Sequence, residues 1–286
     1  MTRPTVCVAM PAYNEAEGLG EFIREIHHEL RDTPHSFVVV DDASTDATPQ
    51  VLEALTRSGL PLVHLRNRDN RGHGRSTLLA LHTAVATGAG IVVAVDGDGQ
   101  FSGRDVARLS RQLGSSDAVV AEGVRHFRSV EPYRRAISAA TRLWVRSRCG
   151  AWPADANTPL RAYRADVLTD LLDAVPSRHM TPNLVMSVLS RTWGLEVLEV
   201  PVTCSDRRGS VSVGTTWGAS TRHLPSRRLV TFCVAASVGL LTYPGINSAP
   251  ARVPPGGTSP GRSTPHDHDG APVGSAPDLD QTPAAP

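Results

Sequence analysis

The chain has 286 residues, enough for one large α/β domain or two smaller domains. Its apolar fraction of 40% and charged fraction of 20% are typical of a soluble globular protein. The net charge of +1 offers no basic excess that would indicate nucleic-acid binding. All 29 basic residues are arginine, which excludes any mechanism that needs a lysine.

Strand-like apolar runs alternate with helical patterns along the first half of the chain. The expected strands cover residues 6–10, 37–40, 62–65 and 91–95. The expected helices cover residues 15–30, 48–55, 76–87 and 104–113. Strands without polar alternation are buried on both faces. The pattern therefore predicts a Rossmann-like α/β fold with a mostly parallel sheet flanked by helices.

The second half is less regular but continues the alternation. We expect helices over residues 137–148, 167–172 and 184–193, and strands over residues 160–163 and 195–202. Four cysteines form neither a C-x-x-C pair nor a zinc-spaced cluster, which fits a reducing compartment. Because the N-terminus runs straight into a strand, we expect no signal peptide and a cytoplasmic location.

Two segments follow this α/β region. Residues 229–241 form a 13-residue apolar run flanked by Arg222, Arg227 and Arg228. The run is shorter than the roughly 20 residues that span a bilayer, so it could be a packed helix or a membrane-surface helix. The proline-rich composition after Tyr243 predicts a disordered tail. The expected division is a domain over 1–215, a helical segment over 216–243 and a tail over 244–286.

Polar segments follow three of the predicted strands, at the point where each strand ends. These segments are Pro11–Glu15, Asp41-Asp42 and Asp96-Gly97-Asp98. In parallel sheets, ligands bind outside the carboxyl ends of the strands. The three segments therefore predict one active site at that edge of the sheet.

Asp96 and Asp98, separated and followed by glycines, offer a flexible pair of hard oxygen ligands. Such ligands suit Mg²⁺ or Mn²⁺, which would neutralise a leaving diphosphate. A surface turn and a phosphatase-type nucleophilic aspartate are alternatives. A calcium loop of the EF-hand type fails, since Phe101 and Ala107 stand where glycine and glutamate are needed.

The acidic pair Asp41-Asp42 also ends a buried strand. Either carboxylate could accept a hydrogen bond from a ribose hydroxyl or a base N–H. The alternative is helix capping, for which Ser44, Thr45 and Asp46 are suitable. We expect both, with Asp46 as the cap and Asp41 or Asp42 as the ligand.

Together these motifs resemble family 2 glycosyltransferases of the GT-A fold. The resemblance lies in four segments whose order and spacing agree over about 100 residues: 8–15 (VAMPAYNE), 39–46 (VVDDASTD), 72–74 (GHG) and 95–100 (VDGDGQ). It continues more loosely through residues 123–125, 155–163 and 199–207. In pattern the chain is most similar to the dolichol- and polyprenyl-phosphate mannose synthase branch.

The resemblance implies a role for each matching residue. Pro11, Tyr13 and Glu15 would line the nucleotide pocket, and Asp41 or Asp42 would hold the base or ribose. Asp96, Asp98 and Gln100 would surround the metal and diphosphate, with Asp98 also counted among the catalytic residues. Arg125 and Arg207 would bind phosphate, Arg207 at the catalytic centre, because guanidinium pairs bidentately with phosphate. A surface ion pair is the alternative role for each arginine.

Three departures from the family pattern limit what can be carried over. His73 stands between two glycines where the family often has a basic residue. Residues 208–213 are one residue shorter than in the mannose synthase branch and lack its lysine. Residues 181–183 (TPN) hold no carboxylate, whereas many relatives with hydroxyl acceptors carry an acidic pair at that helix start.

The missing acid bears on the acceptor, because transfer to a hydroxyl needs a general base and a phosphate anion needs none. The sequence therefore favours an inverting transferase that moves a hexose from a UDP- or GDP-sugar to a polyprenyl phosphate, at the inner membrane face. Asp155 could serve as a base, which leaves a sugar or natural-product hydroxyl open. A nucleotidyltransferase and a non-catalytic nucleotide-binding relative are further alternatives.

Overall fold

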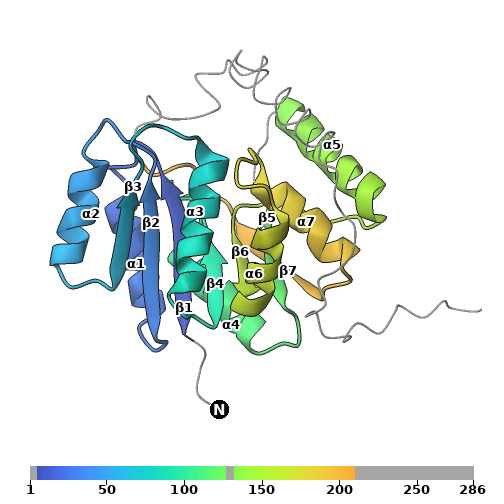
Figure 1. Cartoon of the computed structure of the whole chain (residues 1–286), viewed down its shortest axis with the longest axis horizontal. Helices are drawn as coiled ribbons and strands as arrows, with labels where there is room; N and C mark the ends of the chain where they lie inside the picture. Colours follow the sequence, from blue (N-terminus) through green and yellow to red (C-terminus); the bar gives the residue numbers. More distant parts are fainter. Residues whose placement is uncertain (1–4, 127–131, 210–286) are drawn as a thin grey trace, which may run out of the picture. The chain divides into compact units, whose positions relative to one another are not determined.

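The computed structural model describes residues 5–126 and 132–209. In this part of the chain, seven strands form one sheet in the order β3-β2-β1-β4-β6-β5-β7 (Figure 1). The strands are β1 (Val6–Ala12), β2 (His35–Asp41), β3 (Leu62–Arg66), β4 (Ile91–Ala94), β5 (Val120–His126), β6 (Arg161–Arg164) and β7 (Val197–Thr203). Only β6 among them is antiparallel to its neighbours, β4 and β5. The sheet is therefore mostly parallel, as the sequence predicts.

Alternation of apolar side chains explains why both faces of the sheet are covered. In β1, Val8 and Met10 enter one core, whereas Cys7 and Ala9 enter the other. All seven residues of β1 are buried. Helices must therefore pack on both faces to remove these side chains from water.

Seven helices within the described residues provide this cover. They are α1 (Leu19–Glu29), α2 (Thr48–Arg57), α3 (His73–Ala86), α4 (Gly103–Gly114), α5 (Pro132–Cys149), α6 (Ala165–Ala174) and α7 (Pro182–Thr192). The buried side chains of α1, α2 and α4 join one core. Those of α3, α6 and α7 join the other, and α5 lies against α7 (Figure 1).

The predicted elements are confirmed in kind, with two differences. The helix expected from residue 15 begins at Leu19, because residues 15–18 form a turn fixed by contacts to the next loop. Strand β5 was not among the predicted elements. It carries Glu122 and Arg125, and these charges interrupt the apolar run on which strand prediction depends.

The predicted helical segment over 216–243 and the tail over 244–286 lie outside the described residues, so both stay predictions. The apolar run over residues 229–241 falls in the first of them. Among the described helices, none combines the length and the apolar character required to cross a membrane.

Candidate active site

The carboxyl ends of β1 and β2 lie side by side, and their loops are hydrogen-bonded to each other. Ala12 pairs with Asp41 in the register of the two strands. Beyond this pair, the N–H of Asn14 donates to Ser44 Oγ at 2.9 Å, and that of Glu15 donates to Thr48 Oγ1 at 2.9 Å. The turn at residues 13–18 is thereby fixed against the start of α2.

Asp46 completes this connection, although it is not the cap residue of α2. Ala47 occupies the cap position and makes no side-chain cap bond. Asp46 instead accepts the N–H of Thr48 at 2.9 Å and the N–H of Ala16 at 3.1 Å. Burial acts to raise the pKa of Asp46, but these hydrogen bonds and that from the Thr48 hydroxyl lower it overall.

Asp41 and Asp42 are buried and have partners within the chain. Asp41 accepts the N–H of Ser44 at 2.9 Å and lies 3.0 Å from Nη1 of Arg66. Asp42 accepts the N–H groups of Arg71 at 2.9 Å and Gly72 at 2.8 Å. A third bond to Asp42 comes from the Asn67 amide at 2.8 Å. Asp42 thus shapes the loop that leads into α3, and nucleotide binding by either carboxylate stays a prediction.

The Asp96–Asp98 loop continues β4 and rests on the end of β1. Gly97 donates its N–H to Pro11 O at 3.2 Å. A Cβ atom on Gly97 would lie 2.9 Å from that oxygen, so a glycine is required for this approach. Gly99 has a φ of 66°, in the left-handed region, which turns the chain back toward α4.

The two carboxylates of this loop lie in different surroundings. Asp96 is partly exposed, and its Oδ1 lies 3.5 Å from Nε2 of His73 at the start of α3. Asp98 accepts the N–H of Gln100 at 3.1 Å. Burial, and then the nearby charge of Asp96, raise the pKa of Asp98 to about 6. A divalent cation between two such carboxylates would relieve their repulsion, so the donor set fits the predicted metal.

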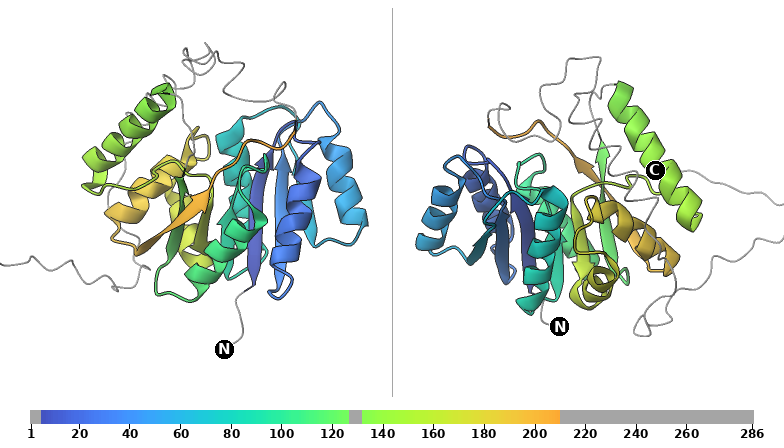
Figure 2. Two further views of the ribbon diagram at one scale, coloured as in Figure 1. Left: turned by 180° about the vertical axis from the view of Figure 1, so that it is seen from behind. Right: turned by 45° about the horizontal axis from the view of Figure 1, so that its top comes forward.

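Residues 204–209, which we term the crossing segment, run from β7 over this loop. Figure 2 shows the segment in orange, reaching from β7 toward the N-terminal half. Ser205 donates its N–H to Gln100 O at 2.9 Å, and Arg208 donates its N–H to Asp98 O at 3.0 Å. Sequence reasoning did not assign Ser205 or Arg208 to the site, because nothing local indicates which loop they meet.

Arg207 of the crossing segment forms a buried ion pair with Glu15. Its Nε donates to Oε2 of Glu15 at 3.1 Å, and Nη2 donates to Oε1. Burial raises the pKa of Glu15 to about 7 despite the attraction of Arg207. The pair borders a cleft of about 310 Å³. Its lining also includes Asn14, Ala16, Glu17, Thr45, Asp46, Arg208 and Gly209.

Arg125 and Asp155 form a second, bidentate pair. Nε and Nη2 of Arg125 donate to the two oxygens of Asp155 at 2.6 and 3.0 Å. Burial acts to lower the pKa of Arg125, but Asp155 and the more distant Asp96 raise it overall. This pair therefore lies within electrostatic range of the predicted metal site. Both arginines predicted to bind phosphate thus contact a carboxylate in the structure.

The start of α7 approaches the start of α3. A Cβ atom on Gly74 would lie 2.5 Å from the carbonyl oxygens of His179 and Met180. The first turn of α7 carries no acidic residue, as the sequence indicates. Residues 181–183 therefore lie close to His73. Many relatives hold an acidic pair at this position, but here the first turn of α7 contributes no carboxylate.

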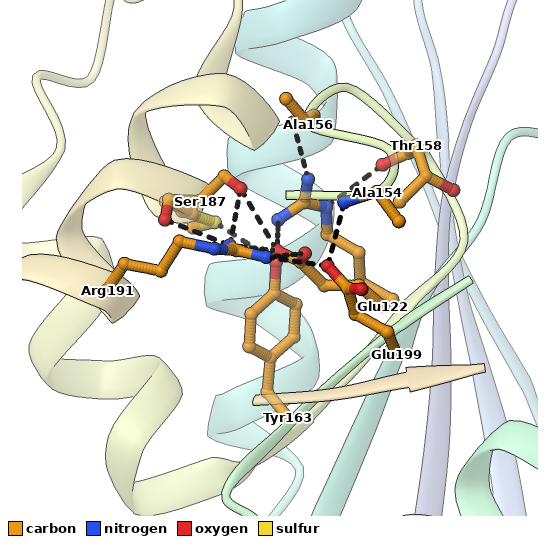
Figure 3. A network of polar contacts seen from close by, with 10 residues as sticks. Glu122, Ala154, Ala156, Thr158, Tyr163, Ser187, Arg191 and Glu199 are labelled. Atoms are coloured by element: carbon orange, nitrogen blue, oxygen red, sulfur yellow. Dashed lines mark hydrogen bonds and ion pairs between the residues drawn. The ribbon is translucent and has the colours of Figure 1, made fainter. Parts of the chain in front are cut away.

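A buried polar network bonds to the backbone on both sides of Asp155, at Ala154 and Ala156 (Figure 3). Arg161 is fully buried and donates to Glu122 at 2.6 Å, to Thr158 O at 2.9 Å and to Ala156 O at 2.8 Å. Arg191 of α7 donates to the second oxygen of Glu122 at 2.7 Å. Burial opposes ionisation of Glu122, but the two arginines lower its pKa overall.

Sequence reasoning missed this network. The available signal was a glutamate directly after the apolar residues 118–121, at Glu122, and an arginine between apolar residues, at Arg161. Buried charges of this kind must be paired. Through Arg161, the network holds residues 156–158, which follow Asp155 directly. Within the described residues, no group of three or more His, Cys, Asp or Glu side chains forms a metal site by itself.

Comparison with known proteins gives consistent matches. The family described as "Glycosyl transferase family 2" matches residues 7–172. The chain is 29% identical over 219 residues to a polyprenol monophosphomannose synthase of Mycolicibacterium smegmatis, covering 73% of this chain and 82% of the relative. It is 28% identical over 209 residues to an undecaprenyl-phosphate mannosyltransferase of Micrococcus luteus, covering 71% and 84%.

Solved structures show the same fold. A mannosyltransferase from Pyrobaculum calidifontis in complex with GDP-mannose and Mn²⁺ is 24% identical, with a TM-score of 0.52. The match covers 74% of this chain and 59% of that one. Glucosyl-3-phosphoglycerate synthase from Mycobacterium tuberculosis, with Mn²⁺, UDP and glucosyl-3-phosphoglycerate, is 19% identical, with a TM-score of 0.58. That match covers 86% and 82%.

Proposed function

The chain belongs to glycosyl transferase family 2, and we propose that it transfers a hexose, with inversion, from a UDP- or GDP-sugar to a polyprenyl phosphate. The observation that carries this proposal is the position of Asp96 and Asp98. They follow β4 at the sheet edge where the loops after β1 and β2 also lie, and the crossing segment is bonded to their loop.

Asp96 and Asp98 would hold a divalent cation, with oxygens of the donor diphosphate and water completing the shell. Hard carboxylate ligands on a glycine-containing loop suit Mg²⁺ or Mn²⁺. Gln100 would lie at the same site, although its N–H and side chain are bonded to Asp98 and Ser205. The bound cation would supply charge neutralisation for the leaving diphosphate. Both solved structures named above contain Mn²⁺ with a nucleotide or nucleotide sugar.

The nucleotide would occupy the cleft beside Glu15 and Arg207. We propose that Pro11, Tyr13 and either Asp41 or Asp42 contact the nucleotide from the adjoining ends of β1 and β2 and the loops after them. Arg207 pairs with Glu15 through Nε and Nη2, so Nη1 is the group that we assign to donor phosphate. Preorganised positive charge at the leaving group stabilises the transition state.

The acceptor phosphate oxygen would attack the anomeric carbon from the face opposite the leaving group. One carbon–oxygen bond forms as the bond to the donor diphosphate breaks, and the electron pair leaves with the nucleoside diphosphate. No proton has to be removed from a phosphate anion. Both oxygens of Asp155 accept N–H groups of Arg125, which leaves this carboxylate poorly suited to act as a base. That pairing favours the phosphate acceptor over a hydroxyl.

The names of the relatives point to the same acceptor class. Both relatives described above are named for polyprenol or undecaprenyl phosphate. Such acceptors reside in membranes, and we propose that this chain works as a peripheral protein at the inner membrane face.

Calorimetry with UDP and GDP, with and without Mn²⁺, tests the donor site. We expect one nucleotide to bind only with metal, and Asp98→Ala to weaken that binding at least tenfold. Transfer should fall about 10²- to 10³-fold in the same variant. Asp117→Ala, at an exposed aspartate before β5, is the matched control and should change neither. Absence of nucleotide binding in the unaltered chain would overturn the proposed function.

The acceptor is tested separately with the nucleotide sugar that binds. Polyprenyl phosphate should accept the hexose, whereas the corresponding polyprenol should not. Transfer to the alcohol or to a free sugar, abolished by Asp155→Asn, would favour the hydroxyl acceptor instead.

A further inference from the structure

Helix α5 and the turn after it form the most basic stretch of the described chain. Residues 132–153 contain five arginines and no aspartate or glutamate. Residues of the opposite charge are common elsewhere in the chain, which has a net charge of only +1. The positive charge is therefore concentrated locally in a way that the bulk composition conceals.

Four side chains at the end of this stretch form one surface, which we term the α5 patch: Arg142, Leu143, Arg146 and Trp152. The guanidinium carbons of Arg142 and Arg146 lie 5.0 and 5.4 Å from the centre of the Trp152 ring. Arg142 also donates to Pro153 O at 3.0 Å, which fixes the turn against the helix. Leu143 is 59% exposed and Trp152 is 50% exposed, although both are large and apolar.

The opposite side of α5 attaches the helix to the domain. Val145 is fully buried, and Trp144 and Cys149 pack against the core that α7 shares. Helical spacing places Arg142, Leu143 and Arg146 together on the other side. Figures 1 and 2 show α5 beside α7 at the periphery of the domain. The α5 patch is thus presented outward by a helix that is anchored from behind.

We propose that the α5 patch binds the surface of an anionic phospholipid membrane. Tryptophan and leucine would enter the headgroup region, and the arginines would contact lipid phosphates while their stems remain on the apolar side chains. A basic helix with a few apolar anchors, and without acidic residues, is complementary to such a surface in both charge and polarity.

This inference rests on the proposed function and deepens it, because a lipid-linked phosphate acceptor lies at a membrane surface. Trp152 precedes Asp155 by three residues, and Asp155 is bonded to Arg125. Membrane contact through the α5 patch would bring this pair close to the lipid headgroups. The same contact would leave the nucleotide cleft, built from the loops after β1 and β2, on another part of the sheet edge.

Co-sedimentation of the full chain with vesicles tests the proposal. Vesicles of phosphatidylcholine alone are compared with vesicles of equal parts phosphatidylcholine and phosphatidylglycerol. We expect binding to the second kind, weakened by salt, and little binding to the first. Tryptophan emission should shift to shorter wavelength with the anionic vesicles, and Trp152→Phe should remove most of that shift.

Substitutions locate the contact. Arg146→Gln should weaken binding about fivefold, and Arg142→Gln with Arg146→Gln about 25-fold. Leu143→Gln should also weaken binding, and its side chain is exposed, so folding is preserved. Arg111→Gln, at an exposed arginine on α4, is the control and should bind as the unaltered chain does. Binding that is unchanged in the double variant would overturn the proposal.

Two further outcomes have a defined meaning. A duplex oligonucleotide that binds the α5 patch as tightly as the anionic vesicles do would overturn the assignment to lipid. Nucleotide binding by calorimetry in the same preparations separates this proposal from the proposed function. A chain that binds nucleotide but no vesicles would refute the α5 patch alone. If the chain binds vesicles through Arg146 but binds no nucleotide, the proposed function is refuted and the membrane contact of the α5 patch is retained.

Discussion

The first four strands and the last three use charged side chains in different ways. In the half built from β1 to β4, carboxylates lie beyond the strand ends and accept backbone N–H groups. Asp42 holds the loop before α3, and Asp46 holds the turn after β1. In the half built from β5 to β7, Glu122 and Arg161 lie inside the strands and pair with each other.

The difference follows from which backbone segments each half has to hold in place. Loops at a sheet edge must expose ligand groups to solvent, and local hydrogen bonds to a carboxylate are enough to shape them. The segment after Asp155 instead has two buried residues, Ala156 and Thr158, whose carbonyl groups need donors. Arg161 supplies two of these donors, and Glu122 makes its burial tolerable.

The largest expected effect tests the buried pair. Arg161→Met leaves Glu122 with Arg191 as its remaining cationic partner and removes the donors to Thr158 and Ala156. We expect a loss of about 3–5 kcal/mol in the free energy of unfolding, measured by urea denaturation. Glu122→Gln combined with Arg161→Met should recover part of this loss, because a neutral amide then replaces the buried carboxylate that has lost one of its two cationic partners, and Arg191 keeps Glu199 as a partner. A loss below about 1 kcal/mol in the single variant would remove the basis of the comparison.

A smaller effect is expected at the edge of the sheet. Asp42→Asn keeps the shape but loses the charge, and it replaces one of the two oxygens that accept the three hydrogen bonds with an NH2 donor. We expect a loss of about 1.5–3 kcal/mol in stability, with faster proteolysis at residues 67–72. Asp69→Asn, at an exposed position in that loop, serves as the control. If Asp42→Asn lowered the free energy of unfolding as much as Arg161→Met does, carboxylates in the two halves would contribute equally to stability.

The smallest effect concerns a purely local bond in the first half. Ser102 is the N-cap of α4, and its hydroxyl accepts the N–H of Asp105 at 3.1 Å. Ser102→Ala should lower the free energy of unfolding by about 1 kcal/mol, which is measured as a lower melting temperature. Ser115→Ala at the other end of α4 should have less effect, since its exposed hydroxyl only donates to the helix carbonyls of Arg111 and Gln112. Equal losses would show that capping is not what Ser102 contributes.

The sequence by itself determined the apolar strands, most of the helices and the position of the polar loops. These features depend on residues a few positions apart, through strand alternation, helical period and glycine at turns. That is why the strand ends carrying Asp41, Asp42, Asp96 and Asp98 could be predicted to meet at one edge. The family resemblance added what those residues would bind.

Tertiary structure alone decided which charged groups meet. Arg207 lies 192 residues from Glu15 in the chain, and Arg191 lies 69 residues from Glu122. Periodicity shows which face a side chain takes but not which distant side chain faces it. The pairs exist because β6 inserts antiparallel between β4 and β5, and because the chain crosses back over the Asp96–Asp98 loop after β7. Strand order is a property of the whole folded chain, so the partners of Arg125, Arg161 and Arg207 appear only there.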